Sequence, residues 1–340
     1  MRLRYIKNVK ITLTNYIKEN RNIMNTKLVL INGEKTNYDG TIDYSILSDD
    51  VSVYPDCSHE DLLNYIQGAG IVVVKEYPLP YEVIKQFPDT VHLLCEAGTG
   101  YNNINLEACK EKGITVCNIP AYSTTCVAQT AMMMILNCAS SMRKQITMLN
   151  NKDHSNFNNF LSVSHVELQG KTLGIVGAGN IGKSVAKLGA AFGMKVLIYT
   201  RTPRENTEDI TYTDFETVVK NADFLSLHCP LTDKTFHLIG EKELGMMKKT
   251  AYLINTARGP LVDEVALIKA LQEGVIAGAG LDVQEVEPTY DDNPLYDMDN
   301  VIITPHMGWK GLETRKRLID ILADNVHAYI NGEPRNVVSK

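Results

Sequence analysis

The glycine-rich stretch GIVGAGNIG, residues 174–182, constrains the fold of this chain more than any other feature. Residues 171–176 have the pattern of a buried strand, and residues 181–192 continue with helical spacing. Gly177, Gly179 and Gly182 form the pattern G-x-G-x-x-G between them. In such a turn the glycines allow a tight bend, close approach of a pyrophosphate and close helix–strand packing, while helix amides face the phosphates. The stretch therefore predicts dinucleotide binding.

Short apolar runs alternate with helical segments along the rest of the chain, which predicts an α/β fold with parallel sheets. A chain of 340 residues is long enough for two domains. Candidate strands of a first block are 28–31, 51–54, 71–74, 92–95 and 115–117. Candidate strands of a second block are 173–176, 196–199, 224–227, 251–254, 279–283 and 301–303. Six strands with crossovers are what a complete dinucleotide-binding domain requires.

Two long helices are predicted outside the glycine turn. Residues 124–150 have the composition of one long buried helix, and its methionines at 132, 133, 134 and 142 are typical of a core or a subunit interface. An Asn-rich connection, 150–159, follows at the surface. Residues 312–330 form an amphipathic pattern that ends at Asn331 and Gly332.

Composition and charge argue against several classes of function, including nucleic-acid binding and membrane insertion. The net charge of -6 argues against a nucleic-acid surface, and no apolar run reaches the roughly 18 residues of a membrane helix. Seven scattered cysteines without a C-x-x-C pattern predict free thiols in the cytoplasm and no metal site. Residues 1–23 carry six basic residues and one acid, Glu19. We expect them to be a dispensable leader, with the folded protein starting near Met24.

Three polar side chains follow strands of the second block, at the edge where open α/β sheets bind ligands. Arg258 follows 251–254, Glu287 follows 279–283, and His306 follows 301–303. Taken singly, each is more typical of a surface or structural residue. Together they suit a 2-oxo acid: arginine binds the carboxylate, histidine exchanges a proton with the carbonyl oxygen, and glutamate orients the imidazole.

Several blocks resemble the D-isomer-specific 2-hydroxyacid dehydrogenase family, from about residue 28 to residue 334. They are GTGYNNINLEACKEKGITVCNIPAYST, LQGKTLGIVGAGNIG, HCPLT, INTARGPLVDEVAL and TPHMGW. Within the family, GYNNIN, VCNIPAYSTTCVAQ and TPHMGW with Trp309 are most similar to glycerate dehydrogenases, also called hydroxypyruvate reductases. In the loop at Lys75 and Glu76, that subgroup more often has Asn-Lys.

The resemblance implies two Rossmann-like or flavodoxin-like domains. A dinucleotide-binding domain, 125–307, is inserted into a discontinuous substrate domain, 24–124 and 308–340. It also implies a homodimer that forms through the cofactor domain, to whose interface the methionine-bearing helix could belong.

The resemblance also implies roles for individual residues. The catalytic residues are Arg258, Glu287 and His306, and the substrate residues are Lys75, Thr99, Gly100, Arg258 and His306. Asp282 binds the nicotinamide amide. The full set expected at the cofactor is Gly177, Gly179, Asn180, Ile181, Gly182, Thr200, Arg201, Arg204, His228, Cys229, Pro230, Thr256, Ala257, Arg258, Asp282, His306 and Gly308.

The residues after the second strand of the cofactor domain bear on the choice between NAD and NADP. NAD-preferring members usually have an aspartate there, which binds the ribose hydroxyl and repels a 2′-phosphate. This chain has Thr200, with Arg201 and Arg204 nearby, so we expect NADP to be favoured over NAD.

The expected function is reduction of hydroxypyruvate or glyoxylate to the D-2-hydroxy acid. A D-lactate or branched D-2-hydroxyacid dehydrogenase would keep the chemistry and change the substrate. A 3-phosphoglycerate dehydrogenase is less favoured, because these often carry an added regulatory domain. A nucleotide-sensing scaffold, similar to co-repressors of this fold, is the alternative of another class.

Overall fold

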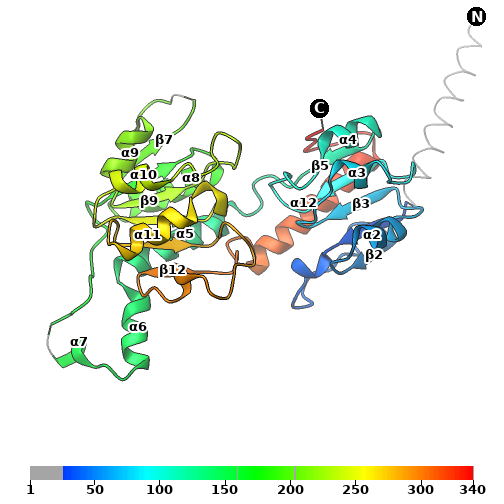
Figure 1. Cartoon of the computed structure of the whole chain (residues 1–340). Helices are drawn as coiled ribbons and strands as arrows, with labels where there is room; N and C mark the ends of the chain where they lie inside the picture. The colour runs from blue at the N-terminus through cyan, green and yellow to red at the C-terminus, as the bar shows by residue number, and fades with distance from the viewer. Residues whose placement is uncertain (1–25, 159, 203, 340) are drawn as a thin grey trace, which may run out of the picture. The chain divides into compact units, whose positions relative to one another are not determined.

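The computed structural model describes residues 26–158, 160–202 and 204–339. The predicted leader, residues 1–23, lies outside the described residues. The described chain divides into two compact units (Figure 1). One consists of residues 26–122 and 310–339, and the other is Ser123–Trp309. The second unit is thus inserted in sequence between the two parts of the first.

The first unit contains a five-stranded parallel sheet with the order β2-β1-β3-β4-β5. This is the order of flavodoxin-like sheets. Its strands are β1 (Leu28–Ile31), β2 (Val51–Tyr54), β3 (Ile71–Val74), β4 (Leu93–Glu96) and β5 (Thr115–Cys117). Its helices are η1 (Gly33–Lys35), α2 (His59–Tyr65), α3 (Tyr81–Ile84), α4 (Leu106–Glu111) and α12 (Leu312–Ile330). Every residue of β1, β3 and β4 is buried, as expected of a parallel sheet covered on both faces.

The C-terminal helix α12 belongs to the first unit because both apolar and charged contacts hold it there. Leu318, Ile319 and Leu322 are buried. Arg315, also buried, donates two hydrogen bonds to the carboxylate of Asp39, at 2.9 and 2.6 Å. This paired geometry is among the stronger interactions available to arginine, and the guanidinium holds the pKa of Asp39 well below its usual range.

The second unit contains a seven-stranded parallel sheet with the order β12-β11-β10-β9-β6-β7-β8. Its strands are β6 (Thr172–Val176), β7 (Lys195–Tyr199), β8 (Ile210–Tyr212), β9 (Phe224–Leu227), β10 (Tyr252–Asn255), β11 (Gly278–Leu281) and β12 (Val301–Ile303). Its helices are α5 (Thr124–Ala139), α6 (Met142–Asn150), α7 (Ser155–Asn158), α8 (Asn180–Ala191), α9 (Phe215–Asn221), α10 (Glu241–Met246), η2 (Gly259–Leu261), α11 (Glu264–Gln272) and η3 (Pro294–Tyr296). The strand order reverses between β6 and β9, which is the Rossmann arrangement.

Alternating side chains of this sheet fill two apolar cores. Ile175, Phe224 and Ile254 face one core with α5 and α8. Leu225 and Leu253 face the other core, with α9, α10 and α11. Helices cover both faces of the sheet, so ligands can reach it at the carboxyl ends of its strands. The predicted α/β fold with two parallel sheets is confirmed.

The prediction of one helix over 124–150 is wrong. The chain forms α5 and α6 instead, with a break at Ser140 and Ser141. Ser141 has φ +44°, in the left-handed region, and a right-handed helix cannot continue through that conformation. The new direction takes α6 and α7 away from the body of their unit (Figure 1).

The sequence prediction also omitted one strand. β8 has three residues, all at least partly exposed, at the edge of the sheet beside β7. Such a short edge strand carries no apolar run, and its pairing is set by tertiary contacts. The other strands agree with prediction within about two residues at their ends.

No helix in the described part of the chain is long and apolar enough to cross a membrane. All seven cysteines are thiols, and four of them are buried: Cys95, Cys109, Cys117 and Cys138.

Candidate active site

The glycine turn lies where the strand order of the second sheet reverses. Gly177 follows β6 with φ +109°, and a Cβ there would lie 2.6 Å from the carbonyl oxygen of His228, which follows β9. A Cβ on Gly182 would lie 2.1 Å from the carbonyl oxygen of Gly177. Both positions therefore need glycine for the fold itself, because the obstructing atoms are backbone.

Gly179 differs from its two neighbours in the motif. It has an ordinary φ of -70°, and no atom of the described residues lies within 4 Å of the position of a Cβ. The protein's own packing does not require glycine here. Gly179 is the N-cap of α8, and among the described residues no side chain caps that helix. Asn180 and Ile181 are its first two residues. This open cradle at an uncapped helix start fits the pyrophosphate of a dinucleotide.

The residues expected to discriminate between NAD and NADP follow β7, the strand next to β6. Gly177 N donates to Tyr199 O at 2.9 Å, which fixes the end of β7 beside the glycine turn. Thr200 comes next and is half-buried, while Arg201 and Arg204 are exposed. The two guanidinium groups are accessible to an anionic ligand.

Thr256 and Ala257 follow β10 at the same edge of the sheet. The Thr256 hydroxyl is buried and has no hydrogen-bond partner within the described ranges. A buried unpaired hydroxyl is unfavourable in a protein, and a ligand at this edge would supply the missing partner. Asn255 shapes the turn: its side chain donates to Arg258 O at 2.9 Å and accepts from Ala257 N at 3.1 Å. The turn leaves the Arg258 side chain exposed, donating to Ala257 O.

His306 and Glu287 form a hydrogen-bonded pair at the carboxyl ends of β12 and β11. His306 Nδ1 lies 2.8 Å from Glu287 Oε2, and the two side chains are 29% and 36% exposed. An ionised carboxylate only accepts hydrogen bonds, so Nδ1 is the donor and Nε2 is left for another partner. Glu287 Oε1 accepts from Gln284 N at 2.9 Å, which fixes the carboxylate. The sequence predicted these two residues, and the structure brings them together.

Asp282 holds the loop that carries His306. Its carboxylate, which is buried, accepts hydrogen bonds from Thr304 Oγ1 at 2.6 Å and from Met307 N and Gly308 N at 2.8 Å each. His306 N donates to the Asp282 carbonyl at 2.9 Å. His306 itself has φ +48°, a backbone conformation that residues other than glycine rarely adopt unless the surrounding structure holds them in it. The predicted contact of Asp282 with nicotinamide stays a prediction.

The carboxyl end of β9 is followed by His228, Cys229 and Pro230, at the same end of the sheet as the residues described above. His228 Nε2 and Ser226 Oγ are 2.8 Å apart. Burial lowers the pKa of His228 to about 4 and raises the pKa of the Cys229 thiol to about 11. Both groups are therefore neutral at pH 7, and Pro230 is exposed.

The predicted substrate residues Lys75, Thr99 and Gly100 belong to the first unit, at the carboxyl ends of β3 and β4. Lys75 is buried, and its ammonium group lies 2.6 Å from Glu76 Oε1. Thr99 Oγ1 donates to Ile119 O at 2.8 Å, and Asn118 Nδ2 donates to Thr99 O at 2.7 Å. These bonds hold the loop at 99–100 in place.

Sequence reasoning missed the side chains that support this edge. Asn255 and Thr304 lie within the blocks INTARGPLVDEVAL and TPHMGW, but those blocks gave them no role, and the backbone of Gln284 belongs to neither block. Their partners lie close in space because of the loop conformation, and no periodicity or spacing signals that. The arrangement combines a cradle for phosphates, an exposed guanidinium group and an oriented imidazole, which are the groups that reduction of an oxo acid needs.

Comparison with known proteins agrees with this geometry. The family model of the D-isomer specific 2-hydroxyacid dehydrogenase NAD-binding domain matches residues 132–308. The chain is 38% identical over 285 residues to a hydroxypyruvate reductase of Blautia hydrogenotrophica, covering 83% of this chain and 88% of that protein. It is 41% identical over 267 residues to a glyoxylate reductase of Thermococcus litoralis, covering 76% and 80%.

A solved structure is similar over nearly the whole length. It is a D-lactate dehydrogenase of Aquifex aeolicus in complex with NAD and lactic acid, with a TM-score of 0.80 and 31% identity, covering 92% of this chain and 99% of that one. Sequence, fold and site geometry lead to the same conclusion. The chain belongs to the D-isomer specific 2-hydroxyacid dehydrogenase family, and it is an oxidoreductase that uses a nicotinamide cofactor.

Proposed function

We propose that this enzyme reduces a short 2-oxo acid, hydroxypyruvate or glyoxylate, to the D-2-hydroxy acid. The observation that carries the proposal is the 2.8 Å contact between His306 and Glu287 at the open edge of the sheet. The similarity to a hydroxypyruvate reductase and a glyoxylate reductase supports the choice of substrate.

In this mechanism His306 is the general acid. Nδ1 is held by Glu287, so the ring is oriented and Nε2 donates a proton to the carbonyl oxygen as the carbon is reduced. Before this transfer both ring nitrogens carry a proton, and Glu287 accepts the hydrogen bond from Nδ1. In the reverse direction, neutral Nε2 accepts the proton from the hydroxyl group. The nicotinamide cofactor, when bound, supplies or accepts the hydride.

Arg258 binds the substrate carboxylate in this proposal. Its guanidinium group is exposed at the carboxyl end of β10 and has the planar fork that matches a carboxylate. The positive charge also polarises the adjacent carbonyl group. Lys75, Thr99 and Gly100 are the residues that we propose for the substrate in the first unit.

The cofactor residues proposed for the second unit are those that the sequence predicted. Gly179, the start of α8 and the unpaired Thr256 hydroxyl suit a dinucleotide. Thr200 lacks the charge that would repel a 2′-phosphate, and Arg201 and Arg204 supply accessible cations. We therefore propose that NADP is accepted and favoured over NAD.

The experiment that tests the function follows absorbance at 340 nm with hydroxypyruvate, glyoxylate, pyruvate and 2-oxoisocaproate, each with NADH and with NADPH. We expect the fastest reduction with hydroxypyruvate or glyoxylate, and a higher kcat/KM with NADPH. Turnover of pyruvate or 2-oxoisocaproate alone would assign the enzyme to the D-lactate or branched-chain alternative. Cofactor binding without turnover of any of them would support the scaffold alternative.

We propose in addition that the enzyme is a homodimer that forms through the second unit. The projecting segment, residues 142–158 with 160 and 161, carries large apolar side chains at the surface: Met142, Ile146, Leu149, Phe157, Phe160 and Leu161. Phe157 is 76% and Phe160 is 90% exposed. An exposed apolar segment of this kind is typical of an interface.

The free thiols suit a reducing compartment, and we propose that the protein is located in the cytoplasm.

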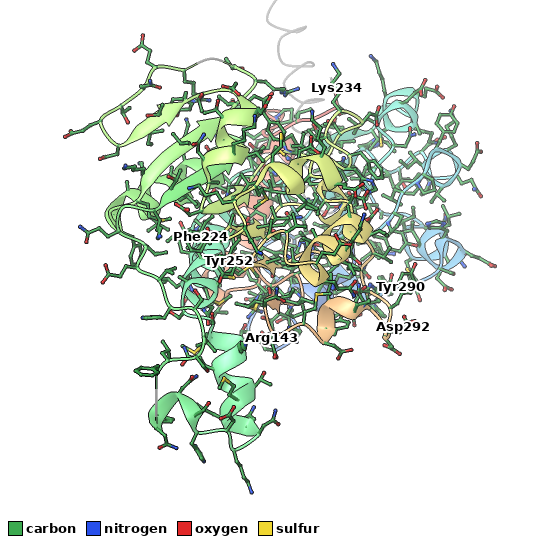
Figure 2. All side chains as sticks on the ribbon, turned by 60° about the vertical axis from the view of Figure 1, so that its left-hand side comes forward. Arg143, Phe224, Lys234, Tyr252, Tyr290 and Asp292 are labelled. Atoms are coloured by element: carbon green, nitrogen blue, oxygen red, sulfur yellow. The ribbon has the colours of Figure 1, made fainter. Side chains whose placement is uncertain are left out.

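A cavity of about 550 Å³ lies beside this segment and supports a second copy as its partner. Arg143, Phe224 and Tyr252 are among its lining residues (Figure 2). The Phe224 and Tyr252 rings stack with their centroids 5.5 Å apart. In a twofold dimer, the projecting segment of each copy can enter the cavity of the other, because a two-fold axis makes every contact reciprocal.

Sedimentation velocity tests the dimer. We expect wild-type enzyme to sediment as a dimer and the Phe157→Ser/Phe160→Ser double variant to sediment as a monomer. Val265→Ser, at another exposed apolar position of the same unit, is the matched control and should remain dimeric. Monomeric wild-type enzyme at micromolar concentration would rule out the proposed dimer.

A further inference from the structure

His237 lies in the second unit between β9 and α10 and has no role in the mechanism above. Its Nε2 is 2.7 Å from Glu285 Oε1, and its Nδ1 is 3.9 Å from Asp263 Oδ2. The ring stacks on Phe236, with centroids 4.0 Å apart. Its φ is +49°, a backbone conformation that residues other than glycine rarely adopt.

Glu285 belongs to the loop that carries Glu287. Its Oε2 accepts from Glu264 N at 3.1 Å, and Glu285 N donates to Glu264 Oε2 at 3.2 Å. These reciprocal bonds attach the loop to the start of α11. The preceding residue, Gln284, donates its N–H to Glu287. The position of Glu285 therefore sets the backbone group that orients the Glu287 carboxylate.

The main chain at His237 holds the other loop, which carries Arg258. His237 N donates to Pro260 O at 2.8 Å. Just before Pro260, a Cβ on Gly259 would lie 1.7 Å from Gln284 O, so the two loops are in backbone contact. His237 thus binds the Arg258 loop through its backbone and the Glu287 loop through its imidazole.

We propose that His237 is a positioning residue of the reaction, which fixes the Arg258 loop and the Glu287 loop relative to each other through its bond to Glu285. The inference rests on the proposed function, since it assumes that Arg258 binds substrate and that Glu287 orients His306. His237 contacts neither substrate nor cofactor in this role. Small displacements of reacting groups are expensive, because catalysis depends on alignment at the scale of an ångström.

The test compares His237→Leu with His237→Gln. Leucine keeps bulk and removes the donor, whereas the glutamine amide can present an N–H to Glu285 in place of Nε2. Both side chains have the same backbone cost at φ +49°, so the comparison isolates the hydrogen bond. We expect kcat for hydroxypyruvate or glyoxylate to fall about 10- to 100-fold in His237→Leu and to return to within about threefold of wild type in His237→Gln.

The dissociation constant of the cofactor should stay within about twofold in both variants, because the glycine turn is not touched. A general loss of structure would weaken cofactor binding as well. Glu285→Gln approaches the same contact from its partner. It removes the charge and leaves one oxygen for two donors, so its kcat should fall by a smaller factor; it also replaces His237→Leu if that variant does not fold.

Glu241→Gln is the matched control. Glu241 binds Lys269 at 2.7 Å in an exposed pair of the same unit and contacts neither loop, so kcat should not change. Equal kcat in wild type, His237→Leu and Glu285→Gln would overturn the inference while leaving the proposed function intact. Inactive wild-type enzyme, in contrast, would overturn the proposed function and the inference with it.

Discussion

Both parallel sheets of this chain carry polar residues at the carboxyl ends of their strands, and these residues differ widely in exposure. In the first unit Asn32, Lys75 and Glu96 are 1%, 2% and 1% exposed. In the second unit the side chains of His306 and Glu287 are 29% and 36% exposed. Strand ends thus concentrate polar groups in both sheets, but exposure differs from residue to residue, since Asp282 at a strand end of the second unit is as buried as Lys75 in the first.

Hydrogen bonds join several of the buried groups of the first unit. Glu96 Oε2 accepts from Asn103 Nδ2 at 2.7 Å, and Oε1 accepts from Glu76 N at 3.2 Å. Asn32 Nδ2 donates to Lys75 O at 3.1 Å. Burial of the carboxyl group raises the pKa of Glu96 to about 7, although the charge of Lys75 and these hydrogen bonds oppose that rise. The network is not fully satisfied, because Asn32 Oδ1 has no hydrogen-bond partner among the described residues.

Glycines show the same contrast. Gly33 follows β1 in the first unit, and a Cβ there would lie 2.4 Å from the Val53 side chain, so internal packing requires the glycine. Gly179 in the second unit has open space around it. At Gly179, unlike at Gly33, the packing of the protein itself gives no reason for a glycine.

Among these predictions, the largest effect on activity should come from a substitution at His306, which is partly exposed at the carboxyl end of β12. His306→Gln removes the proton donor, and we expect kcat to fall about 10³-fold. The thermal midpoint should stay close to that of wild type, because the side chain is partly exposed and packs little. Steady-state kinetics and calorimetry on the same preparation test both parts, and a variant with full activity would contradict the mechanism.

A substitution at Glu96, which is buried at the carboxyl end of β4, should change the stability of the protein and its pH dependence. Its folded-state pKa lies above the ordinary value of 4.5, so the folded state binds the proton more tightly than the unfolded state. Stability is therefore lost as the pH rises from 4.5 to about 7, and a shift of this size corresponds to about 3 kcal/mol. Glu96→Gln should gain stability relative to wild type at pH 8 compared with pH 5.

Urea midpoints at the two pH values measure this difference. Glu333→Gln, an exposed carboxyl group in the same unit, is the control and should not change the pH dependence. Identical pH profiles for Glu96→Gln and wild type would show that ionisation of Glu96 does not affect the stability of the fold.

Gly179, the N-cap of α8, and Gly182, within that helix, separate the needs of the fold from those of the ligand in one motif. Gly182→Ala places a Cβ 2.1 Å from a backbone oxygen, so we expect a loss of stability of about 2 kcal/mol. Gly179→Ala should leave the urea midpoint unchanged and weaken cofactor binding about tenfold, because the added methyl group occupies the space open to the pyrophosphate. Unfolding curves and fluorescence titration with NADPH distinguish the two. Unchanged cofactor affinity in Gly179→Ala would place the ligand elsewhere.

The smallest effect concerns the choice of cofactor. Thr200→Asp restores an acid beside the glycine turn, and we expect the ratio of kcat/KM for NADPH to that for NADH to fall about tenfold, or about 1.4 kcal/mol. The kcat at saturating NADH should remain unchanged, since residue 200 does not take part in the chemistry. Unaltered selectivity would mean that Arg201 and Arg204 are solvated surface residues.

Sequence by itself determined the elements that local patterns encode. Apolar runs located all strands except β8, and the amphipathic pattern located α12 (Leu312–Ile330) with its observed bounds. The glycine spacing identified the turn after β6, and the positions of His306 and Glu287 after predicted strands singled out this pair. These features succeed because backbone preference, burial pattern and turn chemistry are properties of neighbouring residues.

Tertiary structure alone decided what depends on residues distant in sequence. The left-handed Ser141 separates α5 from α6 within a stretch that was predicted as one helix, and β8 exists because β7 pairs with it. The carboxylate of Asp282 holds the loop of His306, and Glu285 is bound by His237, 48 residues away. Hydrogen-bond partners and burial arise from packing of the whole unit, and residue type alone does not show whether a carboxyl group, such as Glu96 or Glu287, will be buried or open to a ligand.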